Sequence, residues 1–140
     1  RRAHCRFEIG DATELPTNIG QFDLVLAANL IDRVKTPEDL LRSFSALVRP
    51  GGHLILSSPY TWLEEFTPKS AWLGGRYDAA GYPKSTISGL KEMLHSAFDL
   101  KVTKELPFLI REHARKFQWS VAQATVWQKK PATGLSDFGS

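Results

Sequence analysis

Hydrophobic and polar residues follow one another along the chain in a pattern that predicts strands and helices in turn. Residues 5–9 alternate apolar and polar side chains, which predicts a short, half-buried strand. Residues 22–28 form a nearly continuous apolar run of strand length, as in a central strand of a parallel sheet that is covered on both faces. Residues 53–58 repeat this character, so we expect a second buried strand there.

A helix is predicted between these two apolar runs. Thr36 can cap its N-terminus and Pro37 suits the first helical position. Apolar residues then recur at helical spacing and should face the sheet: Leu40, Leu41, Phe44, Leu47 and Val48. The Pro-Gly-Gly at 50–52 should end the helix. Strand, helix and strand at this spacing predict a βαβ unit with two parallel strands.

The second half of the chain is less regular. Residues 59–83 mix aromatic side chains with glycine and proline, which is typical of a functional or mobile segment. A second amphipathic helix is predicted from apolar positions between Ile87 and Ala97, followed by strands over 98–105 and 119–127. The polar tail 131–140 is predicted to be disordered. We expect about five strands, three of them parallel and the last antiparallel, with helices on both faces.

Composition narrows the possible classes of protein. The 140 residues carry a formal charge of +3 without a long basic run, so no nucleic-acid partner is expected. No apolar run approaches the roughly 20 residues of a membrane span, and no signal peptide is evident, so we expect a cytoplasmic protein without a membrane partner. Cys5 is the single cysteine, which excludes an internal disulfide, and the scattered histidines suggest no metal site.

Several short motifs occur in a familiar order over about 50 residues. Gly-Asp-Ala at 10–12 and Leu-Pro at 15–16 precede Phe-Asp-Leu-Val at 22–25, and Leu-Val-Arg-Pro-Gly-Gly-His-Leu-Ile follows at 47–55. This order resembles the second half of the class I S-adenosylmethionine (SAM)-dependent methyltransferase fold. The resemblance implies an α/β, Rossmann-like sheet that is partial, because the N-terminal glycine-loop βαβ unit is absent. Residues 1–130 would then be a partial methyltransferase domain, with SAM as cofactor.

Three downstream segments narrow the resemblance. Residues 58–62, 72–75 and 107–120 are similar to the C-terminal methyltransferase domain of ovothiol synthases, a mercaptohistidine N-methyltransferase group, and the match extends over about 7–129. It implies methyl transfer from SAM to an imidazole nitrogen of 5-thiohistidine in ovothiol biosynthesis. The implied partners are this thiohistidine-like small molecule and an N-terminal methyltransferase half or a sulfoxide synthase domain.

Four residues near predicted strand ends are candidates for cofactor binding, since ligands of open α/β sheets bind at the carboxyl ends of strands. Asp11 can accept a hydrogen bond from the adenine amine, while the backbone N–H of Ala12 can donate to a ring nitrogen. Asn29 and Leu30 follow the apolar strand and would lie beside the methyl donor. Asp11 could instead form a hydrogen bond with the backbone of its own turn, and Asn29 could be a polar residue that ends a strand.

Substrate-binding candidates come from the aromatic segment and from the motif near residue 111. The aromatic faces of Tyr60, Trp62 and Trp72 could surround a cationic sulfonium and a flat imidazole, although aromatic residues often belong to the core. Arg111 could pair with a substrate carboxylate, but could equally lie in a solvated loop.

Two residues are candidates for a catalytic role, and neither is certain. Asp32 could touch the substrate or could pair with the adjacent Arg33. His113 could act as a base, although it too could lie in a solvated loop.

The sequence departs from the methyltransferase pattern at its start. No Gly-x-Gly loop and no ribose-binding acidic residue can be placed, which puts independent SAM binding in doubt. The alternative is a truncated, non-catalytic Rossmann-like interaction or dimerisation module; a nucleotide-dependent oxidoreductase would also need the missing loop. Cutting the sheet at its third strand should expose an edge that favours pairing with a partner.

Overall fold

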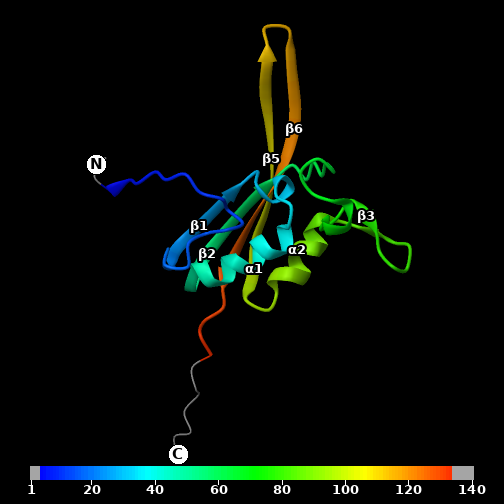
Figure 1. Ribbon diagram of the computed structural model, residues 1–140. Helices are drawn as coiled ribbons and strands as arrows, with labels where there is room; N and C mark the ends of the chain where they lie inside the picture. Colours follow the sequence, from blue (N-terminus) through cyan, green and yellow to red (C-terminus); the bar gives the residue numbers. More distant parts are fainter. Residues whose placement is uncertain (1–3, 134–140) are drawn as a thin grey trace, which may run out of the picture.

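The computed structural model describes residues 4–133, in which four strands form one mixed sheet (Figure 1). The strands are β1 (Phe22–Ala28), β2 (Val48–Ser58), β5 (Phe98–His113) and β6 (Lys116–Lys129), and their order in the sheet is β1-β2-β6-β5. β6 lies between β2 and β5 and is antiparallel to both. The expected antiparallel last strand is therefore confirmed.

The predicted βαβ unit is present. Helix α1 (Pro37–Leu47) connects β1 to β2, and the two strands pair in parallel, with Leu26 opposite Ile55. Pro37 occupies the start of the helix as predicted, but the Thr36 side chain makes no capping bond. The backbone carbonyl of Thr36 instead accepts the Leu40 N–H at 3.2 Å. The prediction that the Thr36 side chain caps the helix was therefore wrong.

The Pro-Gly-Gly turn belongs to a strand rather than to a loop. β2 begins at Val48, directly after α1, and runs through residues 50–52. A Cβ atom at Gly52 would lie 2.8 Å from the Asp23 carbonyl oxygen of β1. Glycine therefore lets the two strands approach closely where their pairing begins.

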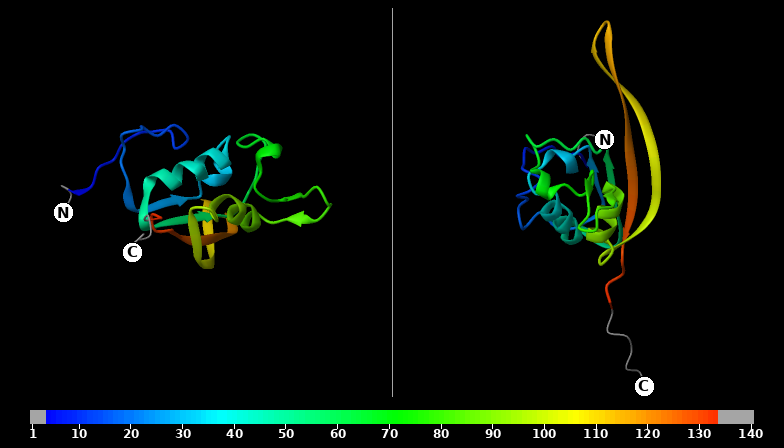
Figure 2. Two further views of the ribbon diagram at one scale, coloured as in Figure 1. Left: turned by 90° about the horizontal axis from the view of Figure 1, so that it is seen from below. Right: turned by 90° about the vertical axis from the view of Figure 1, so that its right-hand side faces the viewer.

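Both helices lie on the same face of the sheet (Figure 2). Helix α2 (Thr86–Leu94) begins after Ser85, whose hydroxyl accepts the Ser88 N–H, and it contacts α1. Together with the inner side chains of β2 and β6 the helices bury the largest core residues, among them Leu40, Leu41, Phe44, Leu54, Leu56, Leu90, Leu94 and Trp127. The expectation of helices on both faces was wrong for residues 4–133.

The opposite face of the sheet carries an apolar row across all four strands. Leu26 neighbours Ile55, Ile55 neighbours Val126, and Val126 neighbours Val102. Leu26 is 63% exposed and Val102 is 49% exposed. This outer face is thus open to solvent over the part of the chain that the structure describes.

The predicted first strand does not form. Residues 5–10 are extended but pair with no strand among residues 4–133, and the Phe7 and Ile9 side chains are fully exposed. A strand needs a hydrogen-bonded neighbour. For the same reason the sheet contains a single parallel pair, β1 with β2, instead of three parallel strands.

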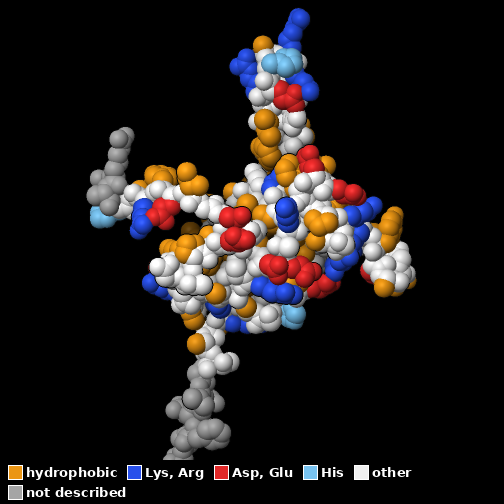
Figure 3. Space-filling model, viewed as in Figure 1, with side chains coloured by type: hydrophobic (Ala, Val, Ile, Leu, Met, Phe, Trp, Pro, Cys, Tyr) orange, Lys and Arg blue, Asp and Glu red, His pale blue; other side chains and the backbone are white. Residues whose placement is uncertain are grey.

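β5 and β6 are much longer than the predicted strands over 98–105 and 119–127. Their residues 106–122 pair only with each other and form a two-stranded projection, which we call the arm (Figure 1). Basic and histidine side chains gather at the end of the arm, with hydrophobic side chains nearer its base (Figure 3).

The remaining segments are short. η2 (Ile31–Arg33) and η3 (Lys69–Ala71) are 3-10 turns, and β3 (Arg76–Tyr77) pairs with β4 (Pro83–Lys84) in a small ladder within the irregular segment 59–83. Residues 131–133 have no regular structure, and the rest of the tail that we predicted to be disordered lies outside the described residues. None of the described helices is both long and apolar enough to cross a membrane.

Candidate functional site

Two residues with unusual backbone conformations mark the carboxyl ends of β1 and β2. Asn29, directly after β1, has φ 51°, and Tyr60, two residues after β2, has φ 55°. The Asn29 N–H donates to the Ser57 carbonyl at 2.7 Å, and the Tyr60 N–H donates to the Ser58 hydroxyl at 3.0 Å. Non-glycine residues rarely adopt this left-handed conformation, and such strain clusters at functional sites. These strand ends are also where open α/β sheets bind ligands.

Asp32 is a buried carboxylate beside these strand ends. It lies in η2 and is 1% exposed. Its Oδ2 atom accepts the Thr61 N–H at 3.0 Å, whereas Oδ1 has no hydrogen-bond partner among residues 4–133. A buried carboxylate oxygen without a partner is costly, so Asp32 Oδ1 lacks a hydrogen-bond donor that residues 4–133 do not supply.

Arg33 provides the positive charge next to Asp32. Its Nη1 atom lies 3.7 Å from Asp32 Oδ2 and donates to the Thr61 carbonyl at 2.9 Å. The guanidinium also lies over the Phe66 ring, 4.8 Å from its centroid. The predicted Asp32–Arg33 pairing is therefore present, and it leaves Asp32 Oδ1 free.

Tyr60 extends the site toward the base of the arm. Its hydroxyl donates to Gln123 Oε1 at 2.9 Å. Burial raises the pKa of Tyr60 to about 12, and the negative charges of Glu105 and Asp32 add to this shift. At neutral pH the phenol keeps its proton and acts as a hydrogen-bond donor.

Trp62 and Trp72 are the two tryptophans of the irregular segment 59–83. Their rings stack with centroids 6.5 Å apart. The indole N–H of Trp62 donates to the Thr86 hydroxyl at 3.0 Å, and that of Trp72 donates to the Thr67 carbonyl at 2.8 Å. Trp62 belongs to the hydrophobic core and Trp72 packs against it. Their part in a substrate pocket stays a prediction.

Arg111 and His113 lie at the far end of the arm. Arg111 faces Phe117 across the ladder, and His113 Nδ1 accepts the Arg115 N–H at 3.2 Å. At about 3.3 Å per residue, Arg111 is roughly 20 Å along the strand from Glu105. The structure does not bring His113 or Arg111 together with Asp32, and their functional roles stay predictions.

Asp11 lies in an exposed turn before β1. Its Oδ1 atom accepts hydrogen bonds from the Thr13 N–H at 2.8 Å and from the Thr13 hydroxyl at 2.6 Å. The hydroxyl bond and then the backbone bond hold the pKa of Asp11 below its usual value. Ala12 packs partly against the core, as Leu30 does after β1. This geometry matches the turn role of Asp11 and leaves its Oδ2 atom available for a ligand.

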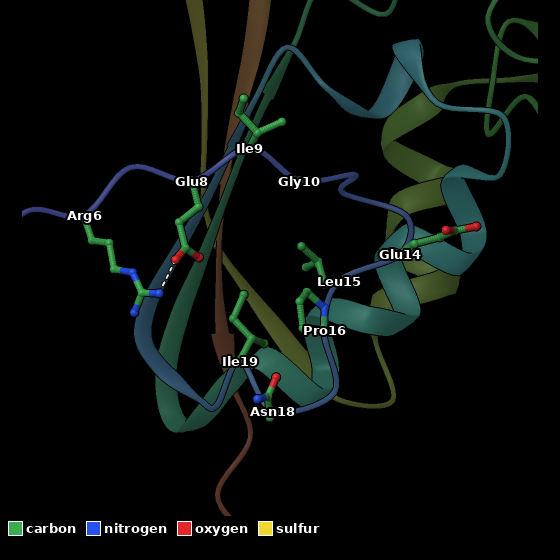
Figure 4. A pocket seen from close by; sticks show the side chains of 9 residues that line it. All are labelled: Arg6, Glu8, Ile9, Gly10, Glu14, Leu15, Pro16, Asn18 and Ile19. Atoms are coloured by element: carbon green, nitrogen blue, oxygen red, sulfur yellow. Dashed lines mark ion pairs between the residues drawn. The ribbon is translucent and has the colours of Figure 1, made fainter.

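A cavity of about 470 Å³ lies beside this turn (Figure 4). Its lining comes from residues 6–19 alone and includes the ion pair of Arg6 with Glu8. Neither Asp11 nor a residue of the strand ends lines it, so we assign no ligand to this cavity. Among residues 4–133 no group of three or more His, Cys, Asp or Glu side chains is placed to hold a metal ion.

Three groups of the site were missed by sequence reasoning. The Thr61 N–H donates to Asp32, and Gln123 accepts the Tyr60 hydroxyl. Glu105 is linked to Tyr60 through Gln123. Glu105 and Gln123 belong to strands far from β2 in sequence. Only the register of β6 against β2 and β5 reveals their position, so no local sequence signal could have found them.

The sequence matches known methyltransferases over its first part. Residues 1–56 match the family described as "Methyltransferase domain". The chain is 34% identical over 84 residues to the ubiquinone/menaquinone biosynthesis C-methyltransferase of Azotobacter vinelandii, covering 60% of this chain and 31% of the relative. It is 36% identical over 52 residues to norajmaline N-methyltransferase of Rauvolfia serpentina, covering 37% of this chain and 18% of that protein. The chain thus spans about a third or less of the curated relatives it matches.

Solved methyltransferase structures share the fold. The N-methyltransferase NodS of Bradyrhizobium japonicum, in complex with S-adenosyl-L-homocysteine, superposes with a TM-score of 0.51 at 13% identity, over 86% of this chain and 52% of NodS. A SAM-dependent methyltransferase of Methanosarcina mazei gives a TM-score of 0.58 at 15% identity, over 89% of this chain and 67% of the other. The fold of this chain is the α/β, Rossmann-like fold of these methyltransferase structures.

Proposed function

We propose that this domain catalyses SAM-dependent N-methylation of a small molecule, the imidazole of 5-thiohistidine. The observation that carries the proposal is Asp32, a buried carboxylate with an unpartnered oxygen at the carboxyl ends of β1 and β2. A C-methyltransferase and an N-methyltransferase both occur among the relatives, so the similarity alone does not select the atom that is methylated. A hydrogen-bond acceptor at this position favours a substrate with an N–H group.

The residues present fit the cofactor at two places. The free Oδ2 atom of Asp11 can accept a hydrogen bond from an adenine amine. The left-handed backbone of Asn29 turns the chain away from β1 at the sheet edge where ligands bind, and Leu30 follows it.

The chemistry assigns a role to Asp32. Bound SAM would supply an electrophilic methyl group for the new N–C bond, with the C–S electron pair returning to its sulfur. Asp32 Oδ1 would accept the N–H on the other imidazole nitrogen, orient the ring and take up the proton that the product releases. Alignment of the reactants contributes most of the rate, up to about 7–11 kcal/mol.

The alternative is a non-catalytic interaction module. It is favoured by the apolar row on the outer face and by β1, which is an edge strand with Leu24 54% exposed. The same features suit an N-terminal methyltransferase half as partner. We therefore propose that catalysis requires this half, supplied by the same or another polypeptide.

The first experiment measures SAM binding by calorimetry, on the chain alone and on the chain joined to an N-terminal half with a glycine-rich loop. Methyl transfer to 5-thiohistidine is then followed by mass spectrometry. We expect binding and turnover only with the joined protein. Asp32→Asn should lower kcat by about 10²–10⁴-fold. The matched control is Asp99→Asn, because Asp99 lies on the outer face and pairs with Lys130. Absence of SAM binding in both proteins would favour the interaction module.

A further inference from the structure

The base of the arm adjoins the candidate site. Ser58, the last residue of β2, pairs with Gln123 of β6, and Gln123 pairs with Glu105 of β5. Beyond this point β5 and β6 continue without β2. Gln123 and Glu105 therefore stand where the carboxyl end of the parallel pair meets the arm.

Both side chains project on the face that carries the helices. Thr125 and Trp127 of β6 are buried on this face, and side chains alternate along a strand, so Gln123 shares it. Its contact with the Tyr60 hydroxyl confirms the assignment. Glu105 lies directly opposite Gln123 and has the same orientation.

A chain of hydrogen bonds links these residues. The Tyr60 hydroxyl donates to Gln123 Oε1 at 2.9 Å, and Gln123 Nε2 donates to Glu105 Oε1 at 2.8 Å. The amide holds both side chains in place and uses one oxygen of the carboxylate. The other oxygen, Oε2, makes no hydrogen bond, and Glu105 has no ion-pair partner among residues 4–133.

The surroundings of Tyr60 are negative on two sides. Glu105 lies on the arm side, and the buried Asp32, with its unpartnered Oδ1, lies on the η2 side. Arg33 partly balances Asp32, whereas no basic group among the described residues pairs with Glu105. An exposed carboxylate that is held by a neutral amide and has no basic partner attracts a positively charged group.

We propose that Glu105 binds a cationic nitrogen of the substrate, such as the ammonium group of an amino acid, and that Gln123 is its positioning residue. The inference rests on the proposed function and deepens it, because it identifies the substrate class as cationic amines that also carry the nitrogen to be methylated.

The test compares two substrates on the full protein with its N-terminal half. One is 5-thiohistidine, and the other is its analogue without the amino group. For the wild type we expect KM to be about tenfold to hundredfold higher for the analogue, the loss typical of a charge-assisted hydrogen bond. Glu105→Gln keeps the bond from Gln123 but removes the charge. It should raise KM for 5-thiohistidine by the same factor, change kcat little, and abolish the difference between the two substrates.

Gln123 is tested through a double-mutant cycle. Gln123→Leu should raise KM for 5-thiohistidine and add little to Glu105→Gln when the two are combined, because both act on one contact. The matched control is Glu112→Gln at the end of the arm, where Glu112 pairs with Lys116, and it should leave KM unchanged.

The outcomes separate this inference from the proposed function. If the wild type methylates 5-thiohistidine but Glu105→Gln retains both KM and the discrimination between substrates, the role of Glu105 is refuted and the proposed function stands. If KM rises additively in the double variant, Gln123 does not position Glu105. If the wild type binds SAM but methylates neither substrate, the proposed function fails together with this inference.

Discussion

Gly89 offers a test in which the tertiary structure and the local helix preference predict opposite signs. Gly89 lies inside α2, where replacing glycine by alanine ordinarily stabilises a helix by about 1 kcal/mol. A Cβ atom at this position would lie 2.1 Å from the carbonyl oxygen of Leu73 and 3.0 Å from the Leu73 Cβ atom. Leu73 is 3% exposed and belongs to the core.

The magnitude follows from the movement needed to relieve this contact. An ordinary contact begins near 3.4 Å, so helix and loop must separate by more than 1 Å from the 2.1 Å position. Overpacking of this kind costs about 1–3 kcal/mol or more, and moving Leu73 out of its packing adds to the cost. The gain in helix propensity offsets part of this packing cost. We therefore expect Gly89→Ala to lower the free energy of unfolding by about 2 kcal/mol.

Urea and thermal denaturation of the full chain measure this change. A loss of about 2 kcal/mol should lower Tm by roughly 6–8 °C for a chain of this size. The matched control is Lys91→Ala, an exposed position of the same helix, which should stay within about 0.5 kcal/mol of the wild type. A Gly89→Ala protein as stable as the wild type, or more stable, would refute the packing of α2 on Leu73.

Three further predictions concern the strand ends. Because Tyr60 has a pKa raised to about 12, the folded protein retains a proton that the unfolded chain loses near pH 10, so stability should fall between pH 10 and 12. Tyr60→Phe should remove up to about 2 kcal/mol of this fall, measured by urea denaturation at pH 9 and pH 11.5. Asn29 has φ 51°, so Asn29→Ala should lower the free energy of unfolding by about 1 kcal/mol and Asn29→Gly should not, measured by thermal denaturation. Arg33→Met leaves the buried Asp32 carboxylate without its cation and should lower the free energy of unfolding, measured by urea denaturation, by about 1–3 kcal/mol.

Each of these has its own control. Tyr82 is exposed, so Tyr82→Phe should leave the alkaline fall in stability unchanged; an equal effect of the two variants would contradict the assignment to Tyr60. Equal stability of the alanine and glycine variants at position 29 would show that the backbone there is not strained. Adding Asp32→Asn to Arg33→Met should restore part of the lost stability, and no recovery would mean that the arginine stabilises the fold through its other contacts.

The sequence determined the elements whose stability depends on neighbours in the chain. The apolar run 22–28, the proline-started helix and the strand over 53–58 formed as predicted because helical hydrogen bonds and the βαβ crossover connect nearby residues. The carboxyl ends of β1 and β2 could therefore be located in advance, and with them Asn29, Asp32 and Tyr60. Their environments could not: the burial of Asp32 depends on Thr61 and Arg33 folding around it.

The tertiary structure decided what depends on pairing between distant strands. Residues 5–9 have a strand pattern but no strand beside them, so their backbone groups remain without a ladder. β5 and β6 extend into the arm because each strand supplies the hydrogen-bond partners of the other and does not need β2. Gln123 contacts Tyr60, and Glu105 contacts Gln123, only because of the register between β2, β6 and β5. A one-residue shift in this register would turn the two side chains to the opposite face of the sheet. Local periodicity indicates which segments can become strands. Partner choice and register, which involve contacts far apart in sequence, determine which of them do and which side chains form the site.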